Sequence, residues 1–391
     1  MKILYVYGME QTKDIIYNLH KLGYDAEEYP RKQEPSMLDD EEMEKLTAYV
    51  KKHRITHLMS IHLIYNLAYV AYRTGTKYVS IIWDAPYIKL YTPFGRMENC
   101  YFSVFDKLDY ERFQKAEIPH VLYQPLAVNQ DNIRRWNLKE KLKGKYRDDI
   151  SFVGSLYDSN SYDRELSGMP QYLQNYFISI FEEAAFHWDG INRVYGKTDG
   201  VILEHIRKVI PGFDLDNKYD IDDIKFFEIL YLIRKIANIE RTCVLNTLGE
   251  AFPVTLYTNA GTDTAMLPSV KVMPPVQPGL SLLTVYACSR INLNISLKGI
   301  EGGTPQRVMD IIAAGGFILT NYCAETAELF EEDKEIVMFR SPEELMEKAD
   351  YYLSHDEERE KIVRAGYEKV LNCYTYEKKL KQLMEWVEGD V

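Results

Sequence analysis

Several common signatures of function are missing from this sequence of 391 residues. The first apolar run lacks Gly-x-Gly-x-x-Gly, and no Walker A lysine motif is present, so nicotinamide binding and nucleoside-triphosphate hydrolysis are poorly supported. Basic residues number 47 against 59 acidic ones, and the net charge of -12 argues against a nucleic-acid partner. No segment approaches the roughly 18 consecutive apolar residues that a membrane-spanning helix needs.

Cysteine is also scarce. The five cysteines are scattered and show no Cys-x-x-Cys spacing, which favours reduced thiols over a disulfide framework or a zinc site. The apolar run at residues 3–8 is too short for a signal peptide and is followed by charged residues. We therefore expect a protein without integral membrane segments, located in the cytoplasm.

What is present indicates a folded α/β protein. Hydrophobic residues make up 46% of the chain and charged residues 27%, as in ordinary globular proteins. Runs rich in β-branched and aromatic residues alternate with segments of helical periodicity, which predicts parallel sheets with helices on both faces. The predicted strands lie at 3–8, 25–29, 56–62, 77–84, 102–106, 120–128, within 148–158, and at 252–258, 270–274, 291–296, 317–322 and 335–339.

The chain is long enough for two domains, since one domain usually holds roughly 100–200 residues. The charged segment RRWNLKEKLKGKYRDD precedes a new strand that ends in a Gly-Ser turn, which predicts a boundary there. We expect an N-terminal domain at 1–147 and a second domain at 148–373 with a mostly helical insertion at about 160–245. A last helix, 374–391, would pack back on the first domain.

The segment EGGTPQRVMDIIAAGG (301–316) carries the clearest functional pattern. It follows a predicted buried strand, and ligands of open α/β sheets bind beyond the carboxyl ends of strands. Gly302 and Gly303 would let backbone N–H groups approach a ligand, and Thr304 is a suitable N-cap for a helix whose positive end favours phosphate. Arg307 in the first turn could bind pyrophosphate oxygens, and Asp310 on the same face could accept from ribose hydroxyls.

A purely structural interpretation of this segment stays open. Arg307 and Asp310 would then form only an i,i+3 surface pair, and the glycines would serve only a turn.

Several segments resemble the CgeB-like (spore-maturation type) glycosyltransferases. They are SFVGSLYD, SRINLNISLKGIEGGTPQRVMDIIAAGGFILTNYCAE, SPEELMEKADYYLSHDEEREKIVRAGYEKV, WDAPY and VFDKLDYERFQKAEIPHVLYQPLAVN. The resemblance covers nearly the whole chain and is weakest through roughly 160–245. It implies a GT-B fold, in which two Rossmann-like domains face a cleft, and a nucleoside-diphosphate-sugar donor, with a UDP-sugar favoured. It also implies that no metal or other cofactor is required.

The resemblance assigns donor-binding roles to several positions. Arg307 would neutralise the diphosphate, with Lys298 as a second cation, and Gly154 and Ser155 would face the phosphates or the sugar. The segment that contains Met273, Pro275 and Val276 would border the nucleobase. Related GT-B enzymes often have Glu where this chain has Asp310, so the ribose contact would be made by a shorter side chain.

The acceptor side has two candidate general bases. Asp84 ends a predicted buried strand in IIWDAPY, and His62 ends the preceding strand. Either could take the acceptor proton in an inverting reaction. The alternatives are that Asp84 caps the following turn and that His62 is structural, and a retaining enzyme would need no protein base.

These observations favour a glycosyltransferase that acts on a hydroxyl of a glycan, protein or small molecule. A non-catalytic nucleotide- or glycan-binding protein of a surface or spore assembly is the main alternative, and sugar-nucleotide epimerisation is another. The acidic stretch DLDNKYDIDD (214–223) superficially offers metal-ligand spacing, but it lacks the features of a calcium loop and is interpreted as a solvated loop.

Overall fold

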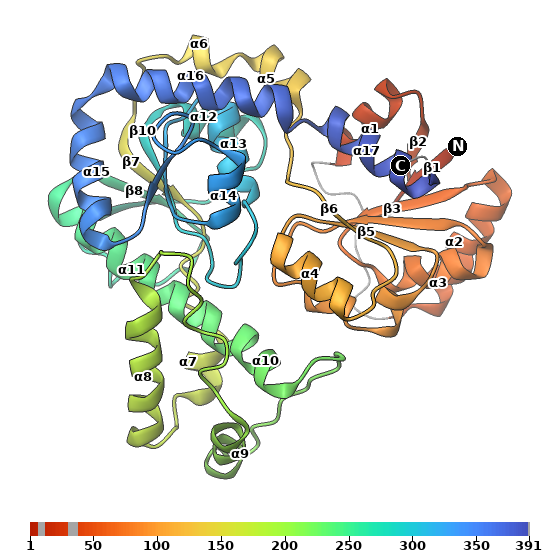
Figure 1. Ribbon diagram of the computed structural model, residues 1–391, viewed down its shortest axis with the longest axis horizontal. Helices are drawn as coiled ribbons and strands as arrows, with labels where there is room; N and C mark the ends of the chain where they lie inside the picture. Colours follow the sequence, from red (N-terminus) through yellow and green to blue (C-terminus); the bar gives the residue numbers. More distant parts are fainter. Residues whose placement is uncertain (7–11, 30–37, 390–391) are drawn as a thin grey trace. The chain divides into compact units, whose positions relative to one another are not determined.

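The structure is a computed structural model that describes residues 1–6, 12–29 and 38–389. The chain divides into two compact units. One unit contains Met1–Arg135, Gly302–Met309 and Val370–Val391, and the other contains Trp136–Glu301 and Asp310–Lys369. Each unit has a six-stranded parallel sheet, which confirms the predicted α/β fold class (Figure 1). No helix in the described part of the chain is long and apolar enough to cross a membrane.

The sheet of the first unit has the strand order β2-β1-β3-β4-β5-β6. Its strands are β1 (Lys2–Tyr5), β2 (Asp25–Glu28), β3 (His57–Ile61), β4 (Lys77–Ile81), β5 (Cys100–Val104) and β6 (Val121–Tyr123). All five residues of β3 are buried, as expected for a parallel sheet that is covered on both faces. The helices and helical turns are α1 (Thr12–Lys21), α2 (Asp40–His53), α3 (Tyr65–Thr74), η1 (Ile88–Leu90), η2 (Pro93–Arg96), α4 (Lys107–Lys115), α5 (Gln130–Trp136) and α17 (Tyr376–Glu388).

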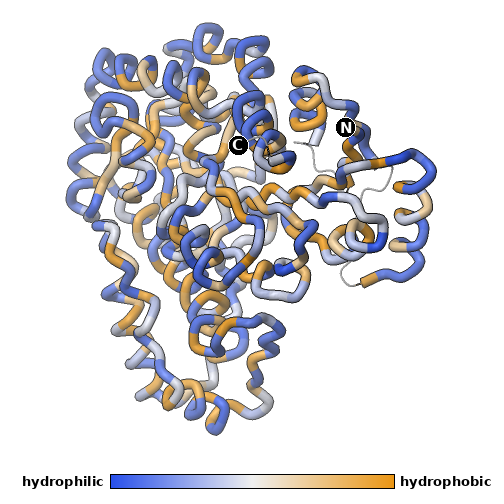
Figure 2. Tube along the Cα trace, turned by 45° about the vertical axis from the view of Figure 1, so that its right-hand side comes forward, coloured by the Kyte–Doolittle hydropathy of each residue, from blue (hydrophilic) through white to orange (hydrophobic). Residues whose placement is uncertain are grey.

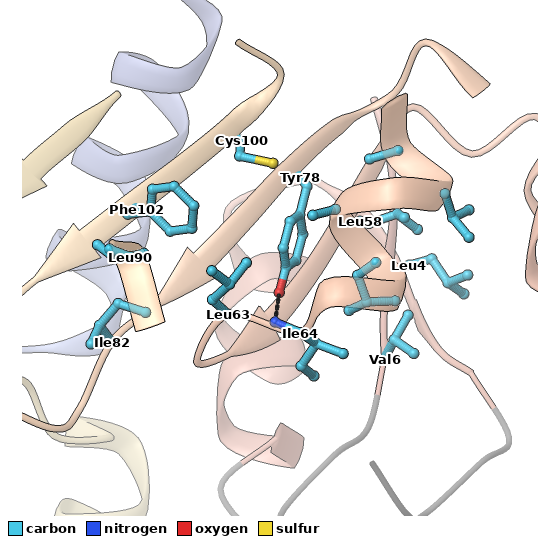
Figure 3. Close-up of a cluster of buried hydrophobic side chains, with 14 of the residues drawn as sticks. Leu4, Val6, Leu58, Leu63, Ile64, Tyr78, Ile82, Leu90, Cys100 and Phe102 are labelled. Carbon is cyan, nitrogen blue, oxygen red and sulfur yellow. Dashed lines mark hydrogen bonds between the residues drawn. The ribbon is translucent and has the colours of Figure 1, made fainter. Parts of the chain in front are cut away.

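Two apolar clusters hold this sheet. One contains Leu58, Tyr78 and Phe102, and Figure 3 shows the Tyr78 ring among apolar side chains, with its hydroxyl at Ile64 in the turn after β3. That hydroxyl accepts a hydrogen bond from Ile64 N–H at 3.0 Å and donates one to the His62 carbonyl at 3.1 Å. The buried tyrosine therefore fixes the turn that carries His62.

The second cluster joins the beginning and the end of the chain. Ile3 and Tyr5 of β1 pack with Ile15 of α1 and with Leu380 and Leu383 of α17. At the end of α17, Glu388 Oε1 lies within hydrogen-bond distance of His57 Nε2, at 2.9 Å. The last helix is thus part of the first unit's core.

The sheet of the second unit has the order β12-β11-β10-β7-β8-β9. Its strands are β7 (Asp148–Val153), β8 (Val254–Tyr257), β9 (Val270–Met273), β10 (Ser289–Asn294), β11 (Ile318–Asn321) and β12 (Val337–Phe339). The helices outside the insertion are α6 (Leu138–Lys141), α12 (Leu280–Ala287), α14 (Ala324–Leu329) and α15 (Pro342–Ser354). Two more helices, α13 (Gln306–Ala314) and α16 (Asp356–Cys373), have residues in both units. Figure 2 shows hydrophobic colour along the strands and more hydrophilic colour on the surrounding helices.

The predicted helical insertion lies between β7 and β8. It consists of α7 (Ser161–Leu166), α8 (Gln171–Ala185), α9 (Gly200–Val209), α10 (Asp223–Phe227), a π-helical turn η3 (Glu228–Leu232) and α11 (Ile233–Ala251). The predicted strands are all present, with ends that shift by a few residues; residues 7–8 of the first predicted strand lie outside the described part of the chain.

A short break separates the last two helices. The last helix is predicted at 374–391, and in the structure α16 ends at Cys373 and α17 begins at Tyr376. The break pairs with Val128, whose N–H donates to the Tyr374 carbonyl at 3.0 Å and whose carbonyl accepts from Tyr376 N–H at 2.9 Å. Since this contact joins residues far apart in sequence, the local pattern could not predict it.

Candidate functional site

The strand order of the second unit reverses between β7 and β10. These strands are neighbours, with Ile150 beside Ile291 and Phe152 beside Leu293. In doubly wound sheets, ligands bind beyond the carboxyl ends of the strands at such a point. The predicted Gly154–Ser155 turn follows β7, and Ser296 follows β10, so the topology brings these two segments to one edge of the sheet.

Arg241 holds this edge together, a role that no local sequence pattern indicates. Its side chain extends from α11 and is only 3% exposed. Nη1 donates to the Ser155 carbonyl at 2.6 Å, and Nη2 donates to the Ile295 carbonyl at 2.7 Å. The guanidinium also lies over the Tyr157 ring, at 5.0 Å from its centroid. One buried cation therefore positions the ends of both β7 and β10.

Gly302 and Gly303 have a packing role that the sequence did not predict. Within the first unit, Gly302 N–H donates to the Asp106 carboxylate at 3.0 Å, and Lys107 N–H donates to the Gly302 carbonyl at 2.7 Å. A Cβ on Gly303 would lie 2.7 Å from the Phe105 ring. The glycines are thus required for close backbone packing, and the Gly302 amide has a protein acceptor rather than being directed to a ligand.

Helix α13 begins at Gln306, one residue later than predicted. Thr304 is fully buried just before it. Arg307 lies in the first turn, and Asp310 lies one turn further along the same helix; both side chains are partly buried and engaged with protein groups. Their spacing retains the shared helix face on which the predicted phosphate and ribose contacts depend.

Lys298 is compensated by a buried carboxylate. Its Nζ lies 3.2 Å from Glu240 Oε1, donates to the His187 carbonyl at 2.8 Å and is 5.0 Å from the Trp188 ring centroid. Trp188 Nε1 donates to the same Glu240 oxygen. Burial raises the pKa of Glu240 and lowers that of Lys298, while their mutual attraction opposes both shifts. Because of this pairing, Lys298 offers a phosphate less positive charge than the sequence suggested.

A small pocket opens beside these residues, at the carboxyl ends of β10 and β11. Its lining includes Trp188 and Asn192 from the insertion, Lys298 and Glu301 from the segment after β10, and Asn321 and Tyr322 at the end of β11. We call it the β10–β11 pocket. Asn192 and Trp188 lie where the family resemblance is weakest, and for that reason their part in it was not predicted.

The predicted nucleobase segment follows β9, the outermost strand of the second sheet, and therefore lies at the same carboxyl end of the sheet. Met273 ends the edge strand β9, and its carbonyl accepts from Thr258 N–H at 3.2 Å. Pro275 is exposed and Val276 is partly buried in the segment that follows. Two strands, β8 and β7, lie between β9 and β10, so these residues are three strand spacings of about 4.8 Å each away from β10.

The two predicted bases meet in the first unit. His62 and Asp84 follow the neighbouring strands β3 and β4, and His62 Nε2 lies 3.4 Å from Asp84 Oδ2. His62 has a left-handed φ of 61°, and its ring stacks on Tyr87 with centroids 5.3 Å apart. Tyr87 also fixes the turn, because its hydroxyl accepts from Leu63 N–H at 2.8 Å. Asp84 lies three residues beyond β4, not on it as predicted.

The protonation of this pair follows from its surroundings. Burial lowers the pKa of His62, although Asp84 opposes the shift. His62 Nδ1 is buried and has no hydrogen-bond partner in the described part of the chain, so a proton there would be unsatisfied. The Asp84 side chain is 75% exposed against 23% for His62. The lowered pKa favours a neutral His62 imidazole. Because the Asp84 carboxylate is the more exposed of the two groups, it is the one that solvent or a substrate can reach.

The acidic stretch at 214–223 has structural contacts. Asp222 caps α10 by accepting from Lys225 N–H at 2.8 Å, and Asp223 accepts from Arg207 at 2.7 Å. Over residues 1–6, 12–29 and 38–389, no group of three or more His, Cys, Asp or Glu side chains is arranged to hold a metal ion.

Comparison with known proteins gives a family match and structural neighbours. Residues 240–385 match the family model described as glycosyl transferase-like. The curated proteins give no significant match. Solved structures with the same fold include a glycosyltransferase from Rickettsia africae, with 10% identity, a TM-score of 0.50 and coverage of 100% of this chain and 99% of that one.

For two further neighbours, the match covers 100% of this chain and 100% of the neighbour. They are sucrose-phosphate synthase from Thermosynechococcus elongatus, with 9% identity and a TM-score of 0.51, and Anabaena HepE in complex with UDP and glucose, with 10% identity and a TM-score of 0.50. At such low identity the similarity shows the fold. The comparisons thus show a glycosyl transferase-like match over residues 240–385 and a GT-B fold for the chain.

Proposed function

We propose that this protein is a CgeB-like, metal-independent glycosyltransferase. It transfers a sugar from a nucleoside-diphosphate-sugar, with UDP favoured as the nucleotide, to an acceptor hydroxyl. The observation that carries the proposal is the glycosyl transferase-like match over 240–385. This range contains the whole segment 301–316, and it also contains β10, one of the two strands at which the strand order of the second sheet reverses. The UDP and glucose bound by HepE, a protein of the same fold, support the choice of donor.

The donor chemistry needs a group that stabilises a leaving diphosphate. In the proposed reaction the bond between the anomeric carbon and the diphosphate oxygen breaks, and its electron pair leaves with the nucleoside diphosphate. Arg307, in the first turn of α13, would neutralise that charge together with the N-terminal amides of the helix. Gly154 and Ser155 would border the phosphates at the end of β7, and Asp310 would accept from the ribose.

The acceptor chemistry needs a proton acceptor if the configuration inverts. The acceptor oxygen forms the new bond to the anomeric carbon, and its proton passes to Asp84. The exposure of Asp84 and the lowered pKa of His62 support this assignment, since a neutral His62 does not hold the Asp84 carboxylate in an ion pair.

The test is turnover of a panel of nucleotide-sugars, measured as release of nucleoside diphosphate with and without a library of acceptors. We expect Arg307→Ala to lower turnover by about 100-fold or more, as for other lost charge-stabilising groups. Arg364→Ala, at an exposed position on α16, is the matched control and should retain full activity. EDTA should have no effect. A fully active Arg307→Ala variant would contradict the proposal.

Another result would favour a different function. Nucleotide binding without hydrolysis or transfer over the whole acceptor library would favour the non-catalytic nucleotide- or glycan-binding protein.

A further inference from the structure

The helical insertion closes one wall of the β10–β11 pocket. Asn192 Nδ2 donates to Glu301 Oε1 at 2.8 Å, and Lys298 Nζ donates to the His187 carbonyl at 2.8 Å. Both contacts join the loop after α8 to the segment after β10. The shape of the pocket therefore depends on a part of the chain that lies outside the residues 240–385 that match the family model.

The loop after α8 is held by its own hydrogen bonds. Asp189 and Arg193 form two side-chain bonds, of 2.6 and 2.7 Å. Asn192 Oδ1 accepts from the N–H groups of Val194 and Tyr195 at 2.9 and 2.8 Å. Asn192 thus uses its oxygen to shape the loop and its amide nitrogen to hold the Glu301 carboxylate.

The same loop is also fixed to the sheet. Trp188 N–H donates to the Arg340 carbonyl at 3.0 Å. Gly190 has a left-handed φ of 81°, and a Cβ there would lie 3.1 Å from the Tyr322 ring. The pocket is therefore built before any ligand arrives, which lowers the ordering cost of binding.

The charges of the pocket disfavour a phosphate group. Lys298 is paired with Glu240 and Arg193 with Asp189, so both cations of the lining already have carboxylate partners. Glu301 adds a carboxylate that would repel an anion. A phosphate ligand needs a surplus of positive charge, which these residues do not supply.

The same groups suit a neutral sugar. Carboxylate and amide oxygens accept hydrogen bonds from hydroxyl groups, and the Lys298 ammonium and side-chain amides donate to them. The aromatic residues of the lining, Trp188 and Tyr322, offer apolar surface for the C–H groups of a pyranose ring. A glycosyl group presents both kinds of surface.

We propose that the β10–β11 pocket binds the glycosyl group of the donor and that Asn192 is a specificity-determining residue, which positions the Glu301 carboxylate against the sugar hydroxyls. This proposal rests on the proposed function, because the sugar reaches the pocket as part of a nucleotide-sugar. It adds that the helical insertion, rather than the family-matched region alone, selects which sugar is transferred.

The experiment compares each nucleoside diphosphate with its sugar-bearing forms by titration calorimetry on the full chain. The probes are UDP, UDP-glucose, UDP-galactose, UDP-N-acetylglucosamine and UDP-glucuronate, together with the guanosine and thymidine diphosphates and their sugars. For the wild type we expect one neutral sugar to raise affinity about tenfold over the bare diphosphate.

The informative variant is Asn192→Asp, which keeps the oxygen that accepts from Val194 and Tyr195 but replaces the donor to Glu301. We expect it to bind the bare diphosphate within about twofold of the wild type and to lose most of the gain from the sugar. Glu301→Gln, which can still accept from Asn192, should lose the same gain. Asn175→Asp, at an exposed position on α8 of the same insertion, is the matched control and should behave as the wild type.

Each other outcome has a definite meaning. A sugar gain that survives in Asn192→Asp and Glu301→Gln would overturn the proposal, and so would an equal loss for the diphosphate and the nucleotide-sugar, because that pattern indicates a structural role only. Tightest binding of UDP-glucuronate would overturn the argument against an anionic group. A wild type that binds diphosphates but gains nothing from any sugar would overturn this inference alone, whereas binding of no nucleotide at all would overturn the proposed function.

Discussion

At the scale of single residues, the sequence showed which positions are unusual but not what they contact. The pair Gly302–Gly303 was identified from its pattern, yet its partners, Asp106 and Phe105, lie almost 200 positions earlier in the chain. Arg241 was not identified because an arginine within a helix has no distinctive local pattern. His62 and Asp84 were proposed separately, and only the pairing of β3 with β4 shows that they lie side by side.

Asp109 gives a residue-scale prediction about pH. It is 4% exposed, and its carboxylate accepts from Tyr87 N–H at 3.1 Å and from Arg112 Nη1 at 3.0 Å. Burial and the neighbouring Asp106 raise the pKa of Asp109 to about 7, although Arg112 and Tyr87 oppose the shift. The pKa of an aspartate in the unfolded chain is about 3.9. Between about pH 4 and about pH 7 the folded state therefore holds a proton that the unfolded state has lost.

The sign of the effect follows from that proton. The free energy of unfolding should fall as the pH rises from about 4 to about 7, by at most about 1.4 kcal/mol per pH unit. Asp109→Asn removes the titrating group, so its urea midpoint should change less between about pH 5.5 and pH 8 than that of the wild type. Asp350→Asn, an exposed position on α15, is the control. Equal pH dependence in wild type and Asp109→Asn would show that Asp109 keeps its ordinary titration.

At the scale of elements, the sequence was informative where a segment's own pattern decides its structure. Buried parallel strands are short apolar runs, and all of those predicted are present, because burial on both faces demands such runs. Boundaries were less predictable where tertiary contacts set them. The break between α16 and α17 depends on Val128, and α13 begins one residue after Pro305.

The last helix gives an element-scale prediction. Leu383 of α17 is fully buried in the cluster that contains Ile3 and Tyr5 of β1. Leu383→Ala should therefore lower the free energy of unfolding of the first unit by about 2–5 kcal/mol, the usual cost of a cavity in a core. Two methods would measure this loss of stability: urea unfolding of the protein and native-state hydrogen exchange of the β1 amides. Lys381→Ala, on the exposed side of the same helix, should change little, and an unchanged midpoint for Leu383→Ala would mean that α17 contributes little to that core.

At the scale of the whole molecule, two parallel sheets give the GT-B fold, and the proposed function depends on what the second sheet carries at the point where its strand order reverses. Strand alternation allowed the fold to be predicted, whereas the donor role of the segment at 301–316 stays a prediction from its sequence pattern. The wall of the β10–β11 pocket could not be predicted, because it comes from an insertion whose helices have only amphipathic patterns. The pairing of Lys298 with Glu240 could not be predicted either, because it joins residues that are far apart in the sequence.

The most direct test of the account is the thermal stability of the purified protein with a panel of nucleoside diphosphates and nucleotide-sugars, with and without EDTA. A ligand at about 100 times its dissociation constant stabilises the folded state by about 2.7 kcal/mol, which is readily measured as a higher melting temperature. The account predicts a selective rise with one nucleotide, a larger rise with one of its sugars, no effect of EDTA and a loss of the rise in Arg307→Ala. No rise with any nucleotide would contradict it, and the segment at 301–316 would then be a structural turn.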